Sequence, residues 1–318
     1  MTTSLVYSFS YLKHETSEHP ERGLHPEQPE RVAVIVRELK HWHDIHDKLL
    51  WLEPRQAVAQ DILRCHTQSH YDTVYAACER ELGSLDPDTT ISKDSFEVSL
   101  LAAGGVLEAV DALFSQRSQN AFVVARPPGH HATQEKAMGF CLFNNVAIAA
   151  RYAQEKHNID RVMIVDWDVH HGNGTQDIFY KDSSVFFLSL HQYPHYPGTG
   201  TSSEEGDGTA RGYTINVPLR AKTSAKDYRA AFETALEKAL KKLHPELIII
   251  SAGFDSHKLD PLGDFMLENE DFVWMTRKLQ HVAEKYSEGR IVSVLEGGYN
   301  LRTLGSTVAS HIEALTEF

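Results

Sequence analysis

Residues 162–174 carry a cluster of side chains that can do metal chemistry. An apolar run ends at Asp166 and is followed at once by Asp168, His170 and a glycine-rich segment. In an extended chain alternate residues share a side, so we expect these three polar residues on one side. Unpaired buried charges are very costly, and a divalent cation is their simplest partner because aspartate oxygens and histidine nitrogens are common zinc ligands. A helix N-cap is the alternative, but a cap needs only one such residue.

Asp255 is a candidate third metal ligand, because it closely follows another apolar run at 247–251. Three protein ligands leave one coordination position open for water, which is the pattern of catalytic rather than structural zinc sites. Water bound in this way ionises near neutral pH and becomes a nucleophile. We therefore expect Asp168, His170 and Asp255 to form a hydrolytic metal centre.

Two adjacent histidines, His130 and His131, follow a stiff Pro-Pro-Gly turn. One can act as general base, and the other as electrostatic partner or acid. Each ring needs an acceptor that orients it, and Asp166 and Asn173 are the candidates. Tyr299 follows two glycines that let the backbone bend, so its phenol is a candidate donor to a developing oxyanion. A tyrosine simply packed in a loop is the alternative for Tyr299.

The elements that must position these motifs alternate between strand and helix. This order predicts an α/β fold with a mostly parallel central sheet flanked by helices on both faces. The carboxyl ends of parallel strands lie at one edge of a sheet, so the motifs should converge on one crevice there. Strands are predicted at 4–9, 121–125, 162–165, 185–190, 213–217, 247–251 and 291–295, and helices at 29–44, 68–81, 95–114, 144–155, 225–242, 269–286 and 301–315.

The composition of this 318-residue chain limits the classes of partner that it can bind. Its formal net charge of −13 argues against a nucleic-acid footprint, which would be basic, and is compatible with a cationic substrate. The 3 cysteines lie in no paired spacing and the N-terminus has no signal-peptide pattern, so we expect a cytoplasmic protein. No apolar run approaches the roughly 18 residues that span a membrane, so no membrane partner is expected. The oligomeric state stays open.

The motifs resemble those of the zinc-dependent histone deacetylase superfamily, whose members share the arginase-like α/β fold. Trp167, Asn173 and the Glu-Gly-Gly after Leu295 are similar to the class II branch, its bacterial histone deacetylase-like amidohydrolases and their acetylpolyamine amidohydrolase relatives. The resemblance implies that residues 1–318 form a single deacetylase catalytic domain. It is carried by His25-Pro-Glu-Gln-Pro-Glu-Arg31, Arg126-Pro-Pro-Gly-His-His-Ala132, Gly139-Phe-Cys141, Asp166-Trp-Asp-Val-His-His-Gly-Asn-Gly174, Gly253-Phe-Asp-Ser256 and Glu296-Gly-Gly-Tyr299-Asn300.

This resemblance assigns roles to the residues singled out above. It implies one zinc ion per chain, although a site with two aspartates and one histidine would also accept iron(II) or cobalt(II). It also implies that Asp166 supports His130 and that Asn173 supports His131. Arg31 and Asp260 either pair with each other or support the floor of the site, and a buried structural role is an equal alternative for both. The implied zinc ligands are Asp168, His170 and Asp255, and the implied catalytic residues are His130, His131, Tyr299, Asp166 and Asn173.

The resemblance further implies a tunnel for an acyl-lysine side chain and two structural potassium sites. Phe140 and Tyr196 would clamp the aliphatic stem of the substrate between aromatic faces. Tyr196 stands where phenylalanine is common, in a segment shorter than usual. Oxygen-rich coordination fits a hard cation such as potassium. The implied tunnel residues are Gly139, Phe140, Tyr196 and Leu262, and the implied potassium ligands are Asp166, Asp168, His170, Ser189 and Leu190 at the inner site and Phe179, Asp182, Val185 and Tyr213 at the second.

We therefore predict a zinc-dependent amidohydrolase that removes an acetyl or other acyl group from a lysine-like amine. Its partner would be an acyl-lysine peptide or protein, or a small acylated amine. An acetylpolyamine amidohydrolase is the first alternative, but such members tend to carry an acid where Leu262 stands; Asp264 lies nearby. A silent acyl-lysine binding module would lack Tyr299. A ureohydrolase with two manganese ions would need extra carboxylates after the metal strands, but His171 stands where one would help and His257 lies at the analogous later site.

Overall fold

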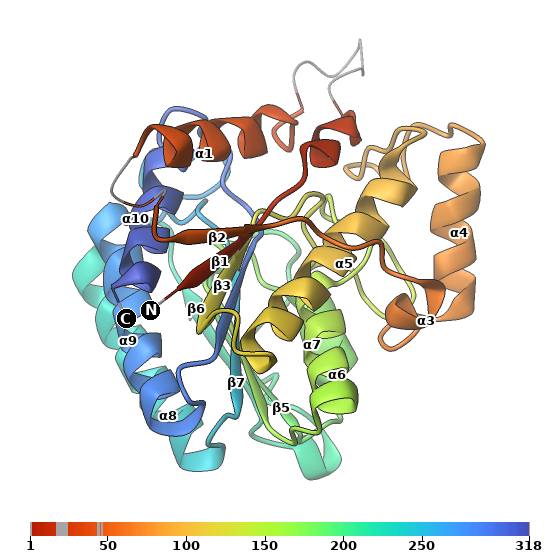
Figure 1. Ribbon diagram of the computed structural model, residues 1–318. Coiled ribbons are helices and arrows are strands. Elements are labelled where there is room, and N and C mark those ends of the chain that lie inside the picture. The colour runs from red at the N-terminus through yellow and green to blue at the C-terminus, as the bar shows by residue number, and fades with distance from the viewer. Residues whose placement is uncertain (1, 17–24, 43–44, 46, 318) are drawn as a thin grey trace.

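The structure is a computed structural model that describes residues 2–16, 25–42, 45 and 47–317. Within these residues, an 8-stranded sheet has the order β2-β1-β3-β8-β7-β4-β5-β6 (Figure 1). Every neighbouring pair of strands is parallel, which confirms the predicted α/β sheet. The strands are β1 (Thr3–Val6), β2 (Leu49–Leu52), β3 (Asn120–Val123), β4 (Val162–Asp166), β5 (Val185–Gln192), β6 (Thr214–Leu219), β7 (Leu247–Ala252) and β8 (Ile291–Leu295).

Helices cover both faces of the sheet, as Figure 1 shows. One layer contains α5, α6 and α7, with α3 and α4 beside α5, and the other contains α1, α10, α9 and α8. The helices are α1 (Glu30–His41), α3 (Ala59–Ile62), α4 (Gln68–Glu79), α5 (Ser95–Phe114), α6 (Asn145–His157), α7 (Asn173–Phe179), α8 (Ala225–Lys242), α9 (Asn269–Tyr286) and α10 (Leu304–Thr316), with short 3-10 helices at Phe9–Lys13 and Gly208–Ala210.

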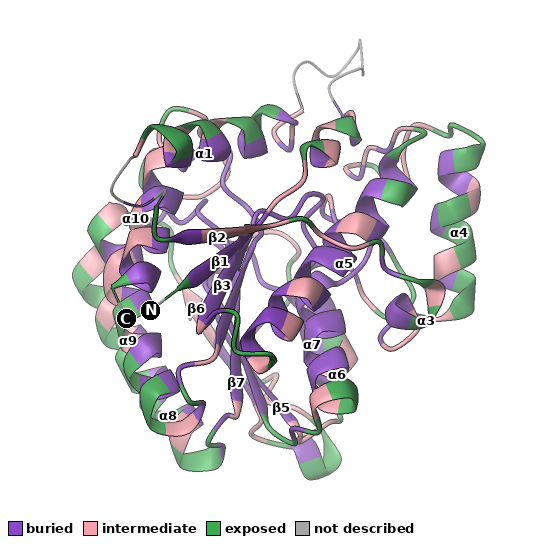
Figure 2. Ribbon diagram, viewed as in Figure 1, coloured by how far each residue is buried: buried purple, intermediate pink, exposed green. Residues whose placement is uncertain are grey.

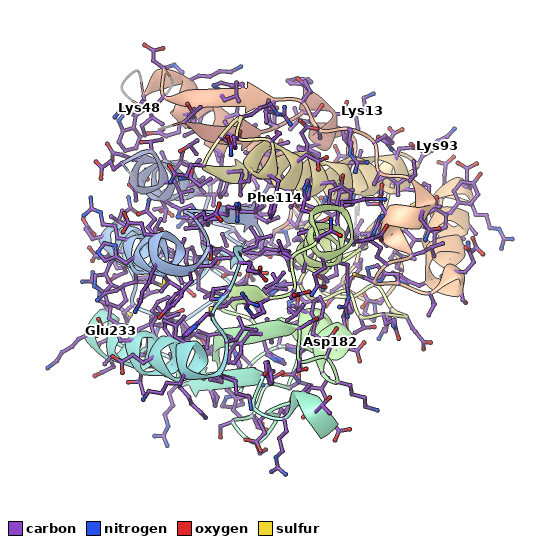
Figure 3. All side chains as sticks on the ribbon, turned by 60° about the horizontal axis from the view of Figure 1, so that its bottom comes forward. Lys13, Lys48, Lys93, Phe114, Asp182 and Glu233 are labelled. Carbon is purple, nitrogen blue, oxygen red and sulfur yellow. The ribbon has the colours of Figure 1, made fainter. Side chains whose placement is uncertain are left out.

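The central strands are buried along their whole length because helices pack on both of their faces. Every residue of β3, β4, β5, β7 and β8 is buried, and these strands appear as a continuous purple layer in Figure 2. Their sequences are therefore near-continuous apolar runs rather than alternating patterns. Charged side chains such as those of Lys48 and Glu233 lie around the outside of the molecule (Figure 3).

Most predicted elements are confirmed, and the differences lie at ends and short segments. The helices predicted at 95–114, 225–242 and 269–286 have the predicted bounds. The first strand ends at Val6, and α1 ends at His41, while predicted helix residues 43–44 lie outside the described residues. The short elements β2, α3 and α7 were not predicted. None of the described helices combines the length and apolar composition that crossing a membrane requires.

Candidate metal centre and catalytic site

The strand order brings the polar motifs of distant segments to one edge of the sheet. β3, β8, β7 and β4 are consecutive neighbours, and all four run in the same direction. The histidine pair follows β3, Tyr299 follows β8 and Asp255 follows β7. β4 ends at Asp166, and Asp168 and His170 follow it. The convergence expected from a parallel sheet is therefore what the structure shows.

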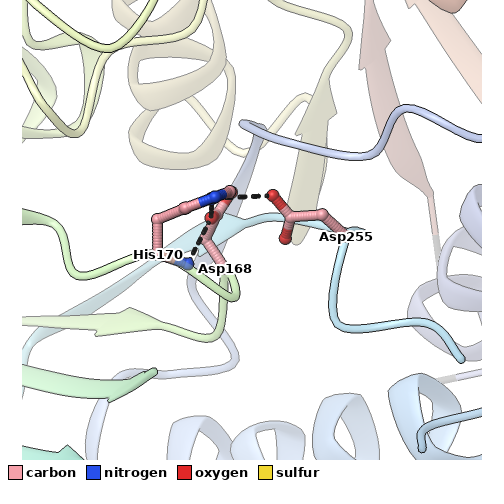
Figure 4. A group of neighbouring side chains, drawn as sticks. All are labelled: Asp168, His170 and Asp255. Carbon is pink, nitrogen blue, oxygen red and sulfur yellow. Dashed lines mark hydrogen bonds and ion pairs between the residues drawn. The ribbon is translucent and has the colours of Figure 1, made fainter. Parts of the chain in front are cut away.

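Asp168, His170 and Asp255 form a compact group of potential metal ligands. One ligand atom from each lies within 4.8 Å of the others, and all three residues are buried. Nδ1 of His170 is 3.0 Å from Oδ1 of Asp168 and 3.2 Å from Oδ2 of Asp255 (Figure 4). Within the part of the chain that the structure describes, this Oδ2 atom has no hydrogen-bond partner. A buried carboxylate oxygen without a hydrogen bond, close to a histidine nitrogen and to a second carboxylate, fits a divalent cation such as zinc.

The pKa shifts of Asp255 and His170 also favour a cation at this trio. Burial raises the pKa of Asp255 to about 7, and the neighbouring Asp168 carboxylate acts in the same direction. Burial alone would lower the pKa of His170, but its contacts with the Asp168 and Asp255 carboxylates raise it to about 10. Both raised pKa values favour a proton on this trio, because two carboxylates lie close together with too little positive charge beside them. A bound divalent cation would supply that positive charge instead.

Backbone amides fix the orientation of both carboxylates. Oδ1 of Asp255 accepts from the N–H of Val169 at 2.8 Å, and Oδ2 of Asp168 accepts from the N–H of Gly297 at 2.8 Å. Gly297 can approach this closely because it has no side chain: a Cβ there would lie 2.0 Å from Oδ2 of Asp255. These contacts hold the candidate ligands in place, as outer hydrogen bonds do at metal sites.

The adjacent rings of His130 and His131 have different partners. Their ring centroids are 4.0 Å apart. Nδ1 of His130 lies 3.0 Å from Oδ2 of Asp166, and Nδ1 of His131 lies 2.8 Å from Oδ1 of Asn173. The structure therefore brings each histidine to the supporting residue that the resemblance implies. The carboxylate adds negative charge beside His130, whereas the amide orients His131 without adding charge.

These partners push the two imidazoles toward opposite protonation states. Burial lowers the pKa of His130, but the carboxylates of Asp166 and Asp168 outweigh it and raise this pKa to about 10. Burial, together with the neighbouring His130 and His170 rings, lowers the pKa of His131 well below its usual value. One histidine is thus suited to carry a positive charge at neutral pH, and the other to accept a proton.

Tyr299 lies at the edge of this group and is held from both sides. Its ring stands 5.9 Å from that of Phe140, and the guanidinium carbon of Arg31 lies 4.8 Å from the ring centre. Burial raises the pKa of Tyr299 well above its usual value, although Arg31 acts to lower it. The phenol therefore keeps its proton at neutral pH and can donate a hydrogen bond.

Arg31 and Asp260 support the Tyr299 loop from different directions. Nη1 of Arg31 is 3.1 Å from Oε1 of Glu27, and Nε donates to the carbonyl of Gly298 at 2.7 Å. Oδ2 of Asp260 accepts from the backbone N–H of Tyr299 at 2.6 Å. These contacts favour support of the Tyr299 loop over a direct pair between Arg31 and Asp260.

The residues implied for a substrate tunnel lie next to the candidate catalytic groups. The ring of Tyr196 stands 5.1 Å from that of His131. Gly139, at φ +56°, lets the chain pass over the same imidazole, because a Cβ there would lie 2.4 Å from Cδ2 of His131. Leu262 is half-buried, and its carbonyl accepts from Nε2 of His195 at 2.9 Å. His195 was not singled out in the sequence, yet its ring stacks on His170 with centroids 5.0 Å apart.

The implied potassium ligands lie on and around β5. Asp166 and Ser189 are register partners across β4 and β5, and Leu190 is the next residue of β5. The hydroxyl of Ser189 is 2.9 Å from Nδ1 of His191. At the second position, the Asp182 carboxylate forms an ion pair with Arg151 at 2.5 Å. Phe179 ends α7, Val185 begins β5, and Tyr213 directly precedes β6.

His171 and His257, which stand where a ureohydrolase would need second-metal ligands, have other partners. The ring nitrogens of His171 lie 2.8 Å from the hydroxyl of Thr199 and 3.1 Å from the amide oxygen of Gln176. Nδ1 of His257 accepts from the backbone N–H of Leu259 at 3.2 Å. These contacts leave neither ring arranged as a ligand beside the trio.

Two buried glutamates, Glu27 and Glu296, were quoted within motifs but not assigned a role from the sequence. Oε1 of Glu27 accepts from Nε of Arg126 at 2.7 Å, in addition to Arg31. Oε2 of Glu296 accepts from the backbone N–H of Gly129 at 2.7 Å. Their positions inside conspicuous motifs were the available signal, since neither residue belongs to a periodic pattern.

Comparisons with known proteins show which proteins this chain is similar to. Residues 25–315 match the family described as the histone deacetylase domain. The chain is 39% identical over 302 residues to a probable deacetylase of Archaeoglobus fulgidus, covering 95% of this chain and 82% of that protein. It is 37% identical over 301 residues to the polyamine deacetylase HDAC10 of Danio rerio, covering 91% of this chain and 44% of that protein. The crystal structure of the HDA15 HD domain matches with a TM-score of 0.92 at 36% identity, covering 98% of this chain and 90% of that chain.

Proposed function

Because the chain belongs to the histone deacetylase family, we propose that it is a zinc-dependent amidohydrolase that removes an acetyl or other acyl group from a lysine-like amine. The observation that carries this proposal is the buried trio of Asp168, His170 and Asp255 beside two histidines with unlike partners. Residues 1–318 would form a single catalytic domain. Zinc is the metal we propose, held by the trio. When bound, it would polarise the amide carbonyl and activate a water molecule.

His131 is the proposed general base. Its Nδ1 donates to the Asn173 amide oxygen, which leaves the lone pair of Nε2 free to accept a proton from the attacking water. Its lowered pKa keeps this ring neutral before the reaction. The same nitrogen can then pass the proton to the leaving amine, so one ring serves as base and afterwards as acid.

His130 and Tyr299 supply positive charge and a hydrogen bond to the transition state. His130 is paired with Asp166 at 3.0 Å and therefore stays protonated while His131 exchanges its proton. The Tyr299 phenol donates to the carbonyl oxygen as negative charge develops there. Burial of Tyr299 excludes water that would compete for this hydrogen bond.

We propose acyl-lysine rather than acylpolyamine as the substrate. A polyamine needs an acid at the mouth of the site to bind its second amine, and Leu262 stands where that acid is expected. The nearby Asp264 is already engaged, because its Oδ1 is 2.7 Å from Nζ of Lys222. The similarity to a polyamine deacetylase keeps the small-amine substrate as the second candidate.

Potassium is proposed as a structural cation at the inner and second positions. The support is geometric: Asp166 and Ser189 are register partners on two paired strands, and Asp166 also contacts His130. At the second position the Asp182 carboxylate is occupied by Arg151, so the ligands there would be backbone carbonyls.

One experiment tests the function and the metals together. Protein with measured zinc and potassium content would be assayed on a fluorogenic acetyl-lysine peptide and on acetylspermidine, with and without a hydroxamate chelator. We expect one zinc per chain and chelator-sensitive turnover of the peptide. Turnover of acetylspermidine alone would move the assignment to polyamine substrates. Zinc-loaded protein that hydrolyses neither substrate would contradict the proposal, and a preparation without potassium would remove that cation from it.

A further inference from the structure

Glu296 is a fully buried acid that lies between the histidine pair and the Tyr299 loop. It directly follows β8, and none of its surface is exposed. Its Oε2 accepts from the backbone N–H of Gly129 at 2.7 Å and from that of His130 at 3.2 Å. Its Oε1 lies 3.4 Å from the hydroxyl of Ser251. The side chain therefore reaches from the end of one strand to the turn after its neighbour.

The backbone around Glu296 is fixed independently of its side chain. Its N–H donates to the carbonyl of Ala252 on β7 at 3.1 Å, and its own carbonyl accepts from the Arg31 guanidinium. The next residue, Gly297, donates to Asp168 at 2.8 Å, and its carbonyl accepts from Phe254 at 3.0 Å. With the main chain held this way, the length of the Glu296 side chain sets how far away the histidine turn can lie.

We propose that Glu296 is a positioning residue, whose carboxylate sets the distance between the His130–His131 turn and the Tyr299 loop. This inference rests on the proposed function, because it concerns the geometry of the same groups. The base and the oxyanion donor must act on one amide bond, yet they come from two different strands, β3 and β8. A displacement of about 1 Å between such groups can cost about 100-fold in rate.

A purely structural role would give different results. If Glu296 only satisfied two buried amides, removing it would cost stability, as any lost buried hydrogen bond does. Its loss would then lower the melting temperature without a specific fall in kcat. A positioning role instead predicts that the reach of the side chain, rather than its charge, decides kcat.

Two substitutions separate reach from charge. Glu296→Gln keeps the length and one acceptor oxygen but removes the charge, so kcat should stay within about threefold of the wild type. Glu296→Asp keeps the charge but shortens the side chain by one methylene, so kcat should fall by about 10-fold to 100-fold. In both variants the KM for an acetyl-lysine peptide should stay within about twofold, because the mouth of the site is unchanged. The opposite order, with Gln inactive and Asp active, would overturn the proposal.

Ser293 offers a matched control on the same strand. Its hydroxyl lies 2.8 Å from Nε2 of His311 on α10, so Ser293→Ala also removes a buried hydrogen bond from β8. We expect Ser293→Ala to lower the melting temperature and to leave kcat unchanged. Equal losses of kcat in Ser293→Ala and Glu296→Asp would show that general destabilisation explains both, and would overturn the positioning role.

Amide hydrogen exchange of the metal-loaded protein gives a readout that does not depend on turnover. The N–H groups of Gly129 and His130 should exchange faster in Glu296→Asp than in the wild type, and at near wild-type rates in Glu296→Gln and Ser293→Ala. Unchanged exchange in Glu296→Asp would overturn the inference. If the wild type hydrolyses neither substrate but these exchange differences appear, the proposed function fails while the positioning contact stands.

Discussion

The floor and the mouth of the candidate site are held by different kinds of contact. The floor residues are buried, and strand ends, backbone amides and ion pairs hold their polar atoms. The mouth residues are half-exposed and packed mainly by aromatic rings and loop carbonyls. We define the floor as Asp166, Asp168, His170, Asp255 and Glu296 with Glu27, Arg31 and Arg126 beside them, and the mouth as Phe140, Tyr196, Leu262 and Asp264.

This difference separates the reaction from the choice of substrate. In the floor, a small displacement changes the distances between reacting groups, because each residue there is fixed by several others. In the mouth, a changed side chain alters the space and charge offered to the substrate and leaves the floor in place. We therefore expect substitutions in the floor to act on stability or kcat, and substitutions in the mouth to act on KM.

The largest expected effect comes from the buried ion pairs of the floor. Glu27→Gln leaves the guanidinium groups of Arg31 and Arg126 without a counter-charge, and both side chains are fully buried. Breaking a buried pair in this way typically costs about 3–5 kcal/mol. Glu233→Gln is the control: its partner Lys278 is 2.5 Å away at the surface, where a pair is worth less than about 1 kcal/mol. Urea unfolding of both variants measures the difference, and equal losses would contradict the comparison.

The same pair predicts how stability depends on pH. Burial acts to raise the pKa of Glu27, but Arg126 and Arg31 outweigh it and lower this pKa from 4.5 to about 2. The stabilisation is therefore complete above about pH 4.5 and is lost as the pH falls toward 2. The gap in stability between the wild type and Glu27→Gln should narrow over that interval. A gap that stays constant as the pH falls would show that the charge of Glu27 is not its source.

Tyr299→Phe should give the next largest effect, on kcat rather than on stability. The change removes one hydroxyl and keeps the ring between Arg31 and Phe140. Loss of one oxyanion donor typically lowers kcat by about 10²–10³. Zinc content and KM should be unchanged, and Tyr286→Phe at the end of α9 should behave as the wild type. A Tyr299→Phe variant with normal turnover would remove this residue from the mechanism.

The smallest effect is expected in the mouth. Phe140→Ala removes a half-buried ring that packs against Tyr299 and His25. We expect KM for an acetyl-lysine peptide to rise by about 10-fold, equivalent to about 1.4 kcal/mol, with kcat within about threefold. Tyr75→Ala on α4 is the control, since it removes an exposed ring elsewhere. If kcat fell and KM did not change, Phe140 would belong with the floor, and the division between the two regions would need to be redrawn.

The fold was largely predictable because its long elements have strong patterns. The helices at Ser95–Phe114, Ala225–Lys242 and Asn269–Tyr286 have long helical patterns, and their ends matched. β2, a four-residue edge strand that borders only β1, was not predicted. α7 begins at Asn173 inside a glycine-rich segment with poor helix propensity, so tertiary contacts must stabilise it.

Site residues could be predicted where a reactive residue type stands at the end of a predicted strand. They were harder to predict where their role depends on contacts with residues distant in sequence. Asp168 and His170 could be predicted because they are polar residues that directly follow an apolar strand. Glu296 was visible only as part of a motif, because its partners Gly129 and His130 are 167 and 166 residues away in sequence. No local pattern encodes a contact of that range, so its role emerges only once β3 and β8 are seen as neighbours.

The position of β8 has a consequence for the order in which the chain can assemble. β8 comes last in sequence among the described strands, yet it lies between β3 and β7. Before it is inserted, β2-β1-β3 and β7-β4-β5-β6 are two separate half-sheets with open edges, which are prone to pair with other chains. During synthesis, the motifs that follow β3 and β7 can come together only after β8 has left the ribosome. A nascent chain that does not yet contain β8 therefore exposes these open edges and has not assembled the site.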